Sequence, residues 1–324
     1  MPSLKMLIGL PASGKTTYAR RLVHTDSNWV HLSSDEIAYA KYPKDQPINH
    51  QEVFQELFLK TLTCLKDGKN VIYDATNLAS QKRKSFINRI KELHVHVEAI
   101  IFITPYDLLK ERNNARESWQ RVPPYILDRY IRAFQFPRKD ENFDECSIIT
   151  DHTWNQPPET KQHSQIIRGR LMEGNLSFNE WMELYNLFED TKPFLWLIKD
   201  SSSLMSAANL NTYQAYKKMV SAAPTPHDQE VMAWTILLHQ IGKAYVRKNR
   251  PMEEDNFYGF EHASTYMAYP ILSSLRIPEP LTWDILLLID EHIIGRQMKR
   301  GKVKRRIGTA NYERLVNFWG FLSE

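Results

Sequence analysis

The chain is poor in cysteine and has no long apolar run. Two of its 324 residues are cysteine, Cys64 and Cys146, which excludes a disulfide framework and a cysteine-based zinc site. No apolar stretch approaches the roughly 20 residues that a membrane-spanning helix needs. The few residues before the first predicted strand leave no room for a signal peptide. We therefore expect a reducing compartment, with a cytoplasmic location and no membrane contact.

Neither sign of charge dominates the chain. Its formal net charge is +4, and its contents of 42% hydrophobic and 25% charged residues are typical of a globular protein. The length is sufficient for two domains, each with its own core. Residues 1–150 contain 22 basic and 18 acidic side chains, so the whole positive excess lies there. This distribution suits a polyanionic partner without requiring one.

The most informative segment is a glycine-rich loop near the start of the chain. The run GLPASGKTT at 9–17 follows apolar residues and fits the spacing GxxxxGK[ST]. Its two glycines allow successive N–H groups to turn toward phosphate oxygens, and the helix that follows directs its positive end at the same anion. The residues expected to bind the nucleotide are Gly9, Pro11, Ala12, Ser13, Gly14, Lys15, Thr16 and Thr17.

The two residues that end this motif predict the cofactors. Lys15 is expected to reach the β- and γ-phosphates, and the Thr16 hydroxyl is a candidate ligand of Mg²⁺. ATP and Mg²⁺ are therefore the predicted cofactors. The alternative is an ordinary glycine-containing turn between a strand and a helix, which requires the whole spacing to be accidental.

Residues 1 to about 135 alternate between short apolar runs and helical periodicity, which is typical of a parallel sheet with helices on both faces. Strands are expected near 5–8, 29–32, 71–73 and 97–103, and amphipathic helices near 15–23, 50–66, 79–93 and 107–115. Ligands of such a sheet should lie outside the carboxyl ends of the strands.

The later part of the chain has a different pattern. Residues 138–165 are polar and contain prolines, as a linker does, and from about 170 onward the periodicity is helical. The expected organisation is an α/β P-loop kinase domain over 1–146, a linker over 147–170 and an all-α domain over 171–324.

Two further segments place polar groups at predicted strand ends. Asp35, in SSDE after the second strand, could accept a proton from a substrate hydroxyl; the alternative is that it caps a helix. Asp74, in DATN after the third strand, could orient metal-bound water, and Thr76 and Asn77 could contact the phosphate acceptor. For these three residues the alternative is simple turn chemistry.

Three arginines follow the fourth strand. Arg112, Arg116 and Arg121 have four- and five-residue spacings, which favour one face of a helix that could close over the triphosphate. An arginine directed at the transferring phosphoryl group stabilises its charge in the transition state. The alternative is a solvated basic face.

In this order and spacing, GLPASGKTT, SSDE, DATN and ERNNAR followed by RVP resemble the phage-type polynucleotide 5′-kinase family over roughly residues 3–146. The resemblance implies that Lys15 and Arg116 contact the transferring phosphate, that Thr16 binds Mg²⁺, and that Asp35 is the general base toward a 5′-hydroxyl. It also implies a lid at 112–121.

One position departs from that family. The arginine three residues after the general base, which holds the acceptor's phosphate in the family, is replaced by Ala38. Either Lys41, Lys44 or a basic group of the C-terminal domain takes this role, or the acceptor differs.

The C-terminal part resembles a second family. LLHQIGK at 237–243, FYGFE at 257–261 and the helical pattern at 286–292 are similar to motifs of the HD phosphohydrolase superfamily. Its members hold metal ions through His and Asp from several helices, and those ions generate a hydroxide that cleaves a phosphoester. The resemblance implies an all-α HD-like domain.

The metal-binding pattern of that superfamily is interrupted here. The aspartate of the His-Asp pair is Gln240, a poor ligand for a hard dication, and the histidine expected after Gly259 is Phe260. No histidine occurs near 213–217, and His163 lies well upstream. His239, His262 and His292 remain as possible ligands. We predict a metal-free, catalytically silent domain; an altered site using His239 and His292 is the alternative.

Two other features belong to this region. The literal His227-Asp228 pair follows Thr225-Pro226 at a predicted helix start, where Asp228 is expected to be an N-cap. The stretch 296–306 contains seven cations, which either attract phosphate backbones or form a solvated loop.

The function that these patterns favour is ATP-dependent transfer of the γ-phosphate to the 5′-hydroxyl of RNA or DNA, with an inactive HD-like domain. The expected partners are RNA or DNA 5′-OH ends and a ligase, with self-association into a homo-oligomer as a further possibility. The alternatives are a small-molecule or aminoacyl-tRNA kinase of the same fold and a nucleotide-gated RNA-binding protein.

Overall fold

The computed structural model describes residues 1–42, 46–150, 161–200, 204–246 and 257–322. The chain divides into two compact units. Unit 1 comprises Met1–Tyr130 and Pro137–His152, and unit 2 comprises Ile131–Phe136 and Thr153–Glu324. Among the described residues, no helix is both long and apolar enough to cross a membrane.

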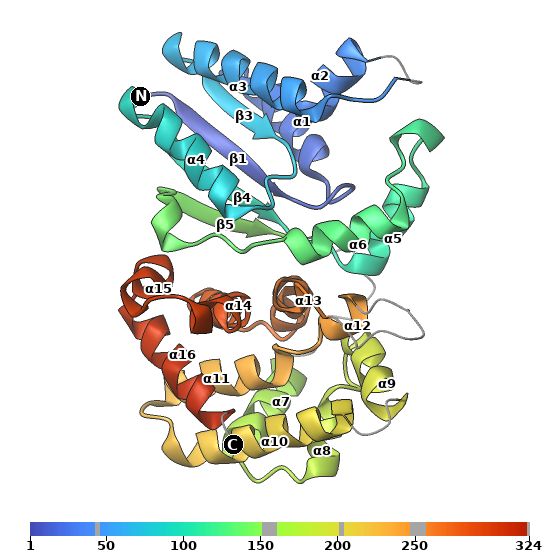
Figure 1. Ribbon diagram of the computed structural model, residues 1–324, viewed down its shortest axis with the longest axis vertical. Helices are drawn as coiled ribbons and strands as arrows, with labels where there is room; N and C mark the ends of the chain where they lie inside the picture. The colour runs from blue at the N-terminus through green and yellow to red at the C-terminus, as the bar shows by residue number, and fades with distance from the viewer. Residues whose placement is uncertain (43–45, 151–160, 201–203, 247–256, 323–324) are drawn as a thin grey trace. The chain divides into compact units, whose positions relative to one another are not determined.

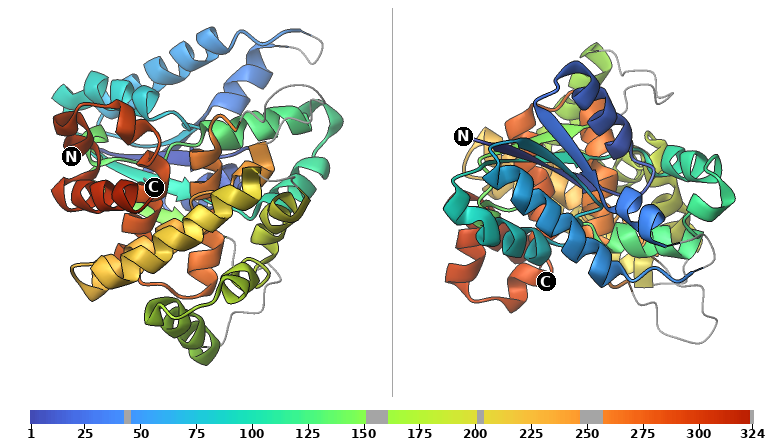
Figure 2. Two further views of the ribbon diagram at one scale, coloured as in Figure 1. Left: turned by 60° about the horizontal axis from the view of Figure 1, so that its bottom comes forward. Right: turned by 90° about the horizontal axis from the view of Figure 1, so that it is seen from above.

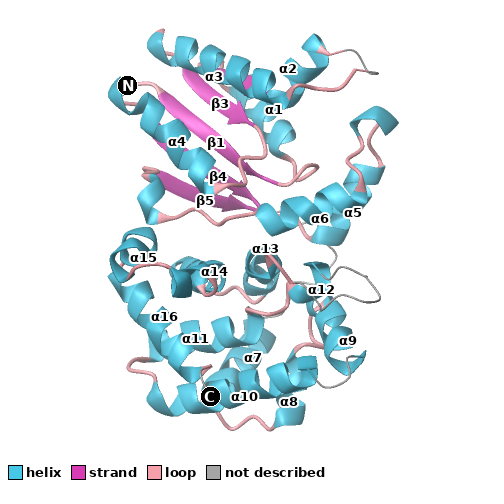
Figure 3. Cartoon of the chain, viewed as in Figure 1, coloured by secondary structure: helices cyan, strands magenta, loops and turns pink. Residues whose placement is uncertain are grey.

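Unit 1 is built on a parallel sheet (Figures 1 and 3). Its strands are β1 (Ser3–Gly9), β2 (Trp29–Ser33), β3 (Asn70–Asp74), β4 (His96–Phe102) and β5 (Glu145–Ile149), in the order β2-β3-β1-β4-β5. The register pairs Ser33 with Asp74 and Gly9 with Phe102. The carboxyl ends of β1, β2 and β3 therefore meet at one edge of the sheet. The segments singled out in the sequence, 9–17, 33–36 and 74–77, lie at these strand ends.

The interior of β1 explains why the sheet is covered on both sides. The residues from Met6 to Gly9 are all buried, and β4 has the same burial pattern. Successive side chains of a strand point to opposite faces. Both faces are therefore shielded from solvent, which is typical of parallel sheets and explains the near-continuous apolar runs of the sequence.

Four helices of unit 1 lie where the periodicity predicts them, and two were not predicted. The described helices are α1 (Lys15–Thr25), α2 (Ser34–Lys41), α3 (His50–Lys66), α4 (Ser80–Ile90), α5 (Tyr106–Asn114) and α6 (Pro124–Ala133), with 3₁₀ turns η1 (Lys91–Leu93), η2 (Ser118–Gln120) and η3 (Lys139–Glu141). The two unpredicted helices are α2 and α6. Both are short, eight and ten residues, so they provide few turns of periodicity.

The stretch expected to be a linker contains regular structure. β5 pairs in parallel with β4, and the Asp144 carboxylate accepts a hydrogen bond from Val97 N at 2.7 Å. The helix α7 begins at Lys161. The remainder of the expected linker, 151–160, lies outside the described residues. A strand of five residues with a charged first residue gives too weak a signal for sequence patterning to detect.

A buried ion pair fastens η3 to α4 within unit 1. The Arg83 guanidinium donates to both carboxylate oxygens of Glu141, at 2.7 and 2.8 Å, and both side chains are fully buried. Arg83 also donates to the carbonyls of Asn77 and Leu78, both at 2.9 Å. Its charge is thus fully hydrogen-bonded, as burial requires.

Every regular element described after residue 160 is helical (Figure 2). The helices are α7 (Lys161–Glu173), α8 (Phe178–Leu184), α9 (Lys192–Asp200), α10 (Leu204–Ala222), α11 (Pro226–Leu238), α12 (Lys243–Val246), α13 (Phe260–Ser274), α14 (Glu279–Glu291), α15 (Arg300–Ile307) and α16 (Thr309–Phe321), with 3₁₀ turns η4 (Glu189–Thr191) and η5 (Ile294–Gln297). The predicted face Trp234, Leu237, Leu238 and Ile241 is buried.

For unit 2, the expected helix cap was wrong, and so was one of the two alternatives for the basic stretch. The N-cap of α11 is Thr225, whose hydroxyl accepts from Asp228 N at 3.1 Å; Asp228 itself binds Arg314. The Thr225 hydroxyl already accepts from a backbone N–H at the start of α11, so the Asp228 carboxylate is left to form an ion pair. The basic stretch is not a loop either, because η5 and α15 cover most of it, and its Arg306 binds the buried Glu291.

Candidate active site

The loop after β1 has the backbone geometry of a phosphate-binding loop. A Cβ at Gly9 would lie 2.8 Å from Ser13 Oγ and 2.9 Å from the Phe102 carbonyl oxygen, so only glycine fits there. Gly14 has φ +93° and is the N-cap of α1. Ala12 also has a positive φ, +65°, which is uncommon for a residue with a Cβ and concentrates at functional sites.

The Lys15 ammonium lies inside this loop. It donates to the carbonyls of Gly9 at 3.0 Å and Leu10 at 2.7 Å, and its side chain is almost wholly buried. Burial lowers the pKa of Lys15 to about 8, while the nearby carboxylates of Asp74 and Asp35 counter part of that shift. The group is therefore still charged at neutral pH but has lost most of its water, which suits it to an anion.

Thr16 and Asp74 meet at the start of α1 and the end of β3. The Thr16 hydroxyl donates to Asp74 Oδ2 at 2.7 Å, and the same oxygen lies 3.0 Å from His31 Nε2 on β2. Burial alone would raise the pKa of Asp74, but the hydrogen bonds from His31 and Thr16 and the charge of Lys15 outweigh it and lower the pKa. Asp74 is thus held as a carboxylate. Sequence reasoning missed His31, which nothing in its local pattern distinguishes.

This pair of oxygen donors fits Mg²⁺. A hydroxyl and a carboxylate are hard ligands, and Mg²⁺ bound with a nucleotide takes only one or two protein oxygens beside water and phosphate. Among the residues that the structure describes, no group of three or more His, Cys, Asp or Glu could hold a metal ion. Thr16 and Asp74 are therefore the side chains that would hold Mg²⁺ at this edge of the sheet.

Asp35 is not the cap of the helix that it begins. Ser33 is the N-cap of α2, with its side chain accepting from Glu36 N at 3.4 Å, so Asp35 occupies the first turn with its carboxylate uncommitted to the cap. The side chain remains open to solvent. The surrounding protein nonetheless desolvates it and raises its pKa, which Lys15 counters and Asp74 reinforces. A carboxylate with a raised pKa is a better proton acceptor than an ordinary one.

Arg116 belongs to the same electrostatic group. Its charge acts on the pKa of both Lys15 and Asp35, and its guanidinium donates to the Gln120 carbonyl at 3.3 Å. Arg121 is exposed and donates to the Arg116 carbonyl at 3.2 Å. The structure therefore brings Lys15, Asp35, Asp74 and Arg116 together.

The expected single helical face of arginines was wrong. Only Arg112 lies in a helix, α5, which ends at Asn114; Arg116 and Arg121 lie on either side of the short turn η2. The Asn113 side chain explains the break, because it donates to the Val122 carbonyl at 2.8 Å and accepts from Val122 N at 3.0 Å. These two hydrogen bonds to the backbone of Val122 close residues 113–122 into a loop.

A ring contact connects this loop to the helix that carries Asp35. Trp119 of η2 and Tyr39 of α2 pack edge to face with ring centroids 4.7 Å apart. Burial raises the pKa of Tyr39, and the nearby charge of Asp35 raises it further. Neither aromatic residue was singled out from the sequence, since each is isolated in its local pattern.

Thr76 and Asn77, the residues predicted to contact the acceptor, form hydrogen bonds within the protein. Asn77 has φ +48°, and its amide donates to the Leu7 carbonyl at 2.7 Å, which is turn chemistry. The Thr76 carbonyl accepts from Gly9 N at 3.0 Å, while its side chain is half-buried. Contact of Thr76 and Asn77 with an acceptor stays a prediction.

Position 38 is closed to a large side chain in this chain. Ala38 is buried in α2. Of the two candidate replacements for a basic group there, Lys41 pairs with Glu52 at 3.1 Å and Glu56 at 3.7 Å, and Lys44 lies outside the described residues. Helix α2 therefore offers no basic side chain at position 38 that could bind a phosphate of the acceptor.

The histidines of unit 2 do not converge. His239 and His292 are adjacent, with ring centroids 5.2 Å apart. His262 instead binds Asp290 through Nδ1 at 2.7 Å and is not among the residues that line the cavity containing the other two. Gln240 donates to His239 Nε2 at 3.1 Å, which occupies the nitrogen that a metal would need. The side chain of His163 lies outside the described part of the chain.

Comparison with known families supports the geometry of unit 1. Residues 4–137 match the AAA domain family. The N-terminal unit has a P-loop kinase-like fold. Such a domain uses ATP, with Mg²⁺ as the usual cofactor.

Two curated proteins are similar to this kinase domain. A protein of Acanthamoeba polyphaga mimivirus that carries the name bifunctional polynucleotide phosphatase/kinase is 28% identical over 151 residues, covering 45% of this chain and 32% of its own length. The bifunctional polynucleotide phosphatase/kinase of Schizosaccharomyces pombe is 22% identical over 160 residues, covering 46% of this chain and 36% of its own. The chain thus spans about a third of the length of these relatives.

Solved structures show only limited likeness. A fungal RNA kinase is 20% identical with a TM-score of 0.37 and covers 53% of this chain and 85% of its own. A chain of the Pnkp1/Rnl/Hen1 RNA repair complex is 24% identical with a TM-score of 0.37 and covers 41% of this chain and 43% of its own. At these TM-scores the likeness assigns no function.

Proposed function

We propose that the protein transfers the γ-phosphate of ATP to the 5′-hydroxyl of RNA or DNA. The observation that carries the proposal is the group formed by Asp35, Lys15 and Arg116, in which a carboxylate with a raised pKa shares its surroundings with two cations. The homology of the domain to polynucleotide phosphatase/kinases supports a nucleic-acid acceptor.

Each residue of the group has one role in the transfer. The Asp35 carboxylate takes the proton from the 5′-hydroxyl as its oxygen attacks the γ-phosphorus. The bond from that phosphorus to the β,γ-bridging oxygen breaks, and its electron pair stays on ADP. Lys15 and Arg116 neutralise charge on the transferring group, where electrostatic stabilisation is the main source of rate. Bound by Thr16 and Asp74, Mg²⁺ would supply further charge neutralisation at the phosphates.

An end-labelling assay tests the proposal. The full chain is incubated with ATP labelled in its γ-phosphate and with 5′-OH RNA, 5′-OH DNA, nucleosides or seryl-tRNA. Label at an oligonucleotide 5′-end is the expected result. Label only on a nucleoside or on seryl-tRNA would instead establish the small-molecule or aminoacyl-tRNA kinase, the candidate that the buried Ala38 favours. ATP binding that oligonucleotide strengthens without any labelled product would establish a nucleotide-gated RNA-binding protein.

Unit 2 is proposed as an HD-like domain without phosphohydrolase activity. Gln240 replaces a charged ligand and occupies His239 Nε2, and His262 is bound to Asp290 away from the cavity. Metal analysis of the purified protein tests this, because stoichiometric transition metal together with release of 3′-phosphate would refute it. A ligase partner, self-association and a cytoplasmic location stay predictions.

A further inference from the structure

Positive charge in the later part of the chain is concentrated in the segment 296–314. This segment contains eight basic residues and one acidic residue. The other residues after 150 contain 12 basic and 19 acidic side chains, so they have a net charge of −7 while the segment has +7. The segment comprises η5, α15 and the start of α16. Such a separation of charge suits a polyanionic partner.

Helix α15 is fastened to unit 2 by its inner side. Val303 and Ile307, one helical turn apart, are fully buried. Arg306 donates to both carboxylate oxygens of the buried Glu291, at 2.9 and 2.6 Å. The helix therefore has a fixed position in unit 2 and presents a defined outer side to solvent.

That outer side consists of cations. The exposed residues of α15 are Arg300, Gly301, Lys302 and Arg305, and the N-cap Lys299 is exposed as well. Within the described part of the chain, none of these four cations forms an ion pair. Their charges are therefore available to a ligand.

The stability of the helix does not explain the cations at its amino end. The helix dipole favours positive charge in the last turn and disfavours it in the first turn. It accounts for Lys304, Arg305 and Arg306, which lie in the last turn. Lys299 at the N-cap and Arg300 as the first helical residue lie at the unfavourable end. Their positions favour a role in binding an anion.

Arg300 and Lys304 converge on one aromatic ring. The Arg300 guanidinium carbon lies 5.5 Å and Lys304 Nζ 5.3 Å from the ring centroid of Tyr312 on α16. Like charges four residues apart on a helix repel each other. The one acid of the segment, Glu313, is exposed and lies 3.9 Å from Lys304 Nζ. The ring thus holds two cations side by side, where a bound anion would relieve their repulsion.

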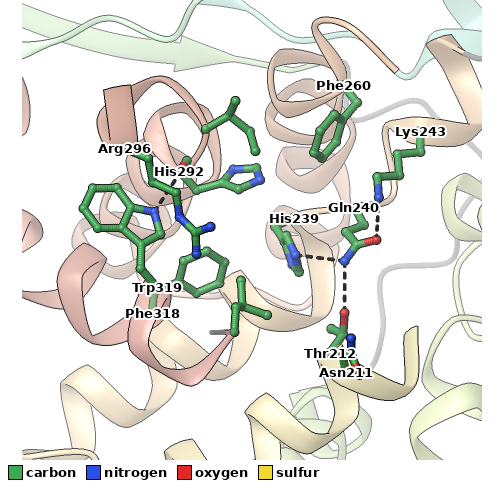
Figure 4. Close-up of a pocket in the computed structure, with 12 residues that line it drawn as sticks. Asn211, Thr212, His239, Gln240, Lys243, Phe260, His292, Arg296, Phe318 and Trp319 are labelled. Carbon is green, nitrogen blue, oxygen red and sulfur yellow. Dashed lines mark hydrogen bonds between the residues drawn. The ribbon is translucent and has the colours of Figure 1, made fainter. Parts of the chain in front are cut away.

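Arg296 belongs to a different surface. It lies over the ring of Trp319, 5.9 Å from its centroid, and lines the cavity of unit 2 (Figure 4). We therefore leave it out of the α15 surface. That surface is defined as Lys299, Arg300, Lys302, Lys304 and Arg305.

We propose that the α15 surface binds the phosphate backbone of a nucleic acid. The eight residues of α15 span about 12 Å at 1.5 Å per residue, which corresponds to three or four phosphates at roughly 3.4 Å per nucleotide along one strand. Arg300 and Lys304 contact neighbouring phosphates, and the other cations add attraction. Contacts of this kind do not depend on base sequence. The proposal does not rest on phosphoryl transfer by unit 1.

The exposed side chains favour a nucleic acid over a membrane or a protein. A helix that lies on a membrane inserts its apolar face into the lipid, whereas Val303 and Ile307 are buried in the protein. A protein interface has aromatic or other apolar anchors at its centre. Every exposed residue of α15 is a cation or glycine, so the helix provides neither.

The salt dependence of binding tests the proposal. The full chain is titrated by fluorescence anisotropy into labelled single-stranded RNA or DNA at several salt concentrations. The strands carry a 5′-phosphate, so binding is measured without phosphoryl transfer. In a plot of log K against log salt concentration, Arg300→Met and Lys304→Met should each reduce the slope by about 0.7, and the double variant by about 1.4. Unchanged slopes would overturn the proposal.

Three matched variants serve as controls. Lys69→Met removes an exposed cation of unit 1 from the turn before β3, and the slope should not change. Lys304→Arg keeps the charge and should also keep the slope. Glu313→Gln removes the acid beside Lys304 and should strengthen binding. If Lys69→Met reduces the slope as much as the α15 variants do, binding reflects net charge alone and the assignment is wrong.

Two further measurements identify the occupant and separate this proposal from the kinase. If the α15 variants lose binding to phosphatidylserine vesicles but keep binding to oligonucleotides, the occupant is a membrane and the proposal is refuted. End labelling of 5′-OH strands is measured on the same preparations. Label transfer with unchanged slopes refutes the α15 surface alone, whereas reduced slopes without any label support this surface and refute the kinase.

Discussion

Replacing Asp35 by asparagine removes the proposed proton acceptor and changes little else. The side chain keeps its size and its place in the first turn of α2, and the helix keeps its cap because Ser33 provides it. The neighbouring Glu36 is a matched control, since it is exposed and binds only the surface Arg20 at 3.0 Å in the described structure. Glu36→Gln therefore removes a carboxylate from the same turn without removing the base.

The expected size of the effect follows from the role. General-base catalysis contributes about 10²–10⁴ in rate, or roughly 3–5 kcal/mol at 1.36 kcal/mol per tenfold. Turnover of Asp35→Asn should fall by that factor, while ATP affinity should change little. The carboxylate also raises the pKa of Lys15, so its loss lowers that pKa further below about 8. The comparison is therefore made at the pH optimum of each protein, so that a change in the charge of Lys15 is not mistaken for the loss of the base.

The pH profile gives a second readout of the same residue. Because the pKa of Asp35 is raised, its active carboxylate form is lost at a higher pH than for an ordinary aspartate as the solution is acidified. Activity should fall through that raised pKa in the natural chain and in Glu36→Gln, and the fall should vanish in Asp35→Asn. Transfer of label to a 5′-OH oligonucleotide measures both quantities. If Asp35→Asn works as fast as Glu36→Gln, the assignment of the base is wrong.

Three other substitutions test the site and the fold. Arg116→Met should lower turnover by up to about 10³–10⁵, whereas Arg121→Met, which removes an exposed arginine of the same loop, should cost far less in the same labelling assay; equal losses would contradict the role of Arg116. Asp74→Asn should raise the Mg²⁺ concentration for half-maximal activity about 10–100-fold, and an unchanged requirement would exclude it as a ligand. Arg83→Met should lower the free energy of unfolding by about 3–5 kcal/mol, because Glu141 is left buried and unpaired; chemical denaturation measures this, and a loss below about 1 kcal/mol would refute the argument.

The features of unit 1 that the sequence predicts are those with a strong local signal. The loop at 9–17 requires two glycines for local reasons. Gly9 lies too close to its neighbours for a Cβ, and Gly14 has a positive φ. The strands β1 and β4 are near-continuous apolar runs because both of their faces are buried. β5 was missed because it becomes a strand only by pairing with β4 across more than 40 residues of chain. Such long-range pairing leaves little trace in a five-residue pattern.

The candidate sites show the same division. Lys15, Thr16 and Asp35 follow from motif spacing, but the arginine loop does not. The helix α5 ends where the Asn113 side chain forms hydrogen bonds with Val122, and the spacing of the arginines carries no information about that contact. The cavity of unit 2 was not predicted either, because its lining comes from five separate segments of the chain.

The edge-to-face contact of Tyr39 with Trp119 has a consequence for turnover. An aromatic pair of this kind is worth about 0.5–1.5 kcal/mol, so it favours the arrangement in which it is intact by roughly two- to tenfold. If substrate entry moved the arginine loop away from α2, this contact would have to break, and its re-formation would bring Arg116 back beside Asp35. A contact of this strength would favour the closed arrangement without preventing the loop from opening.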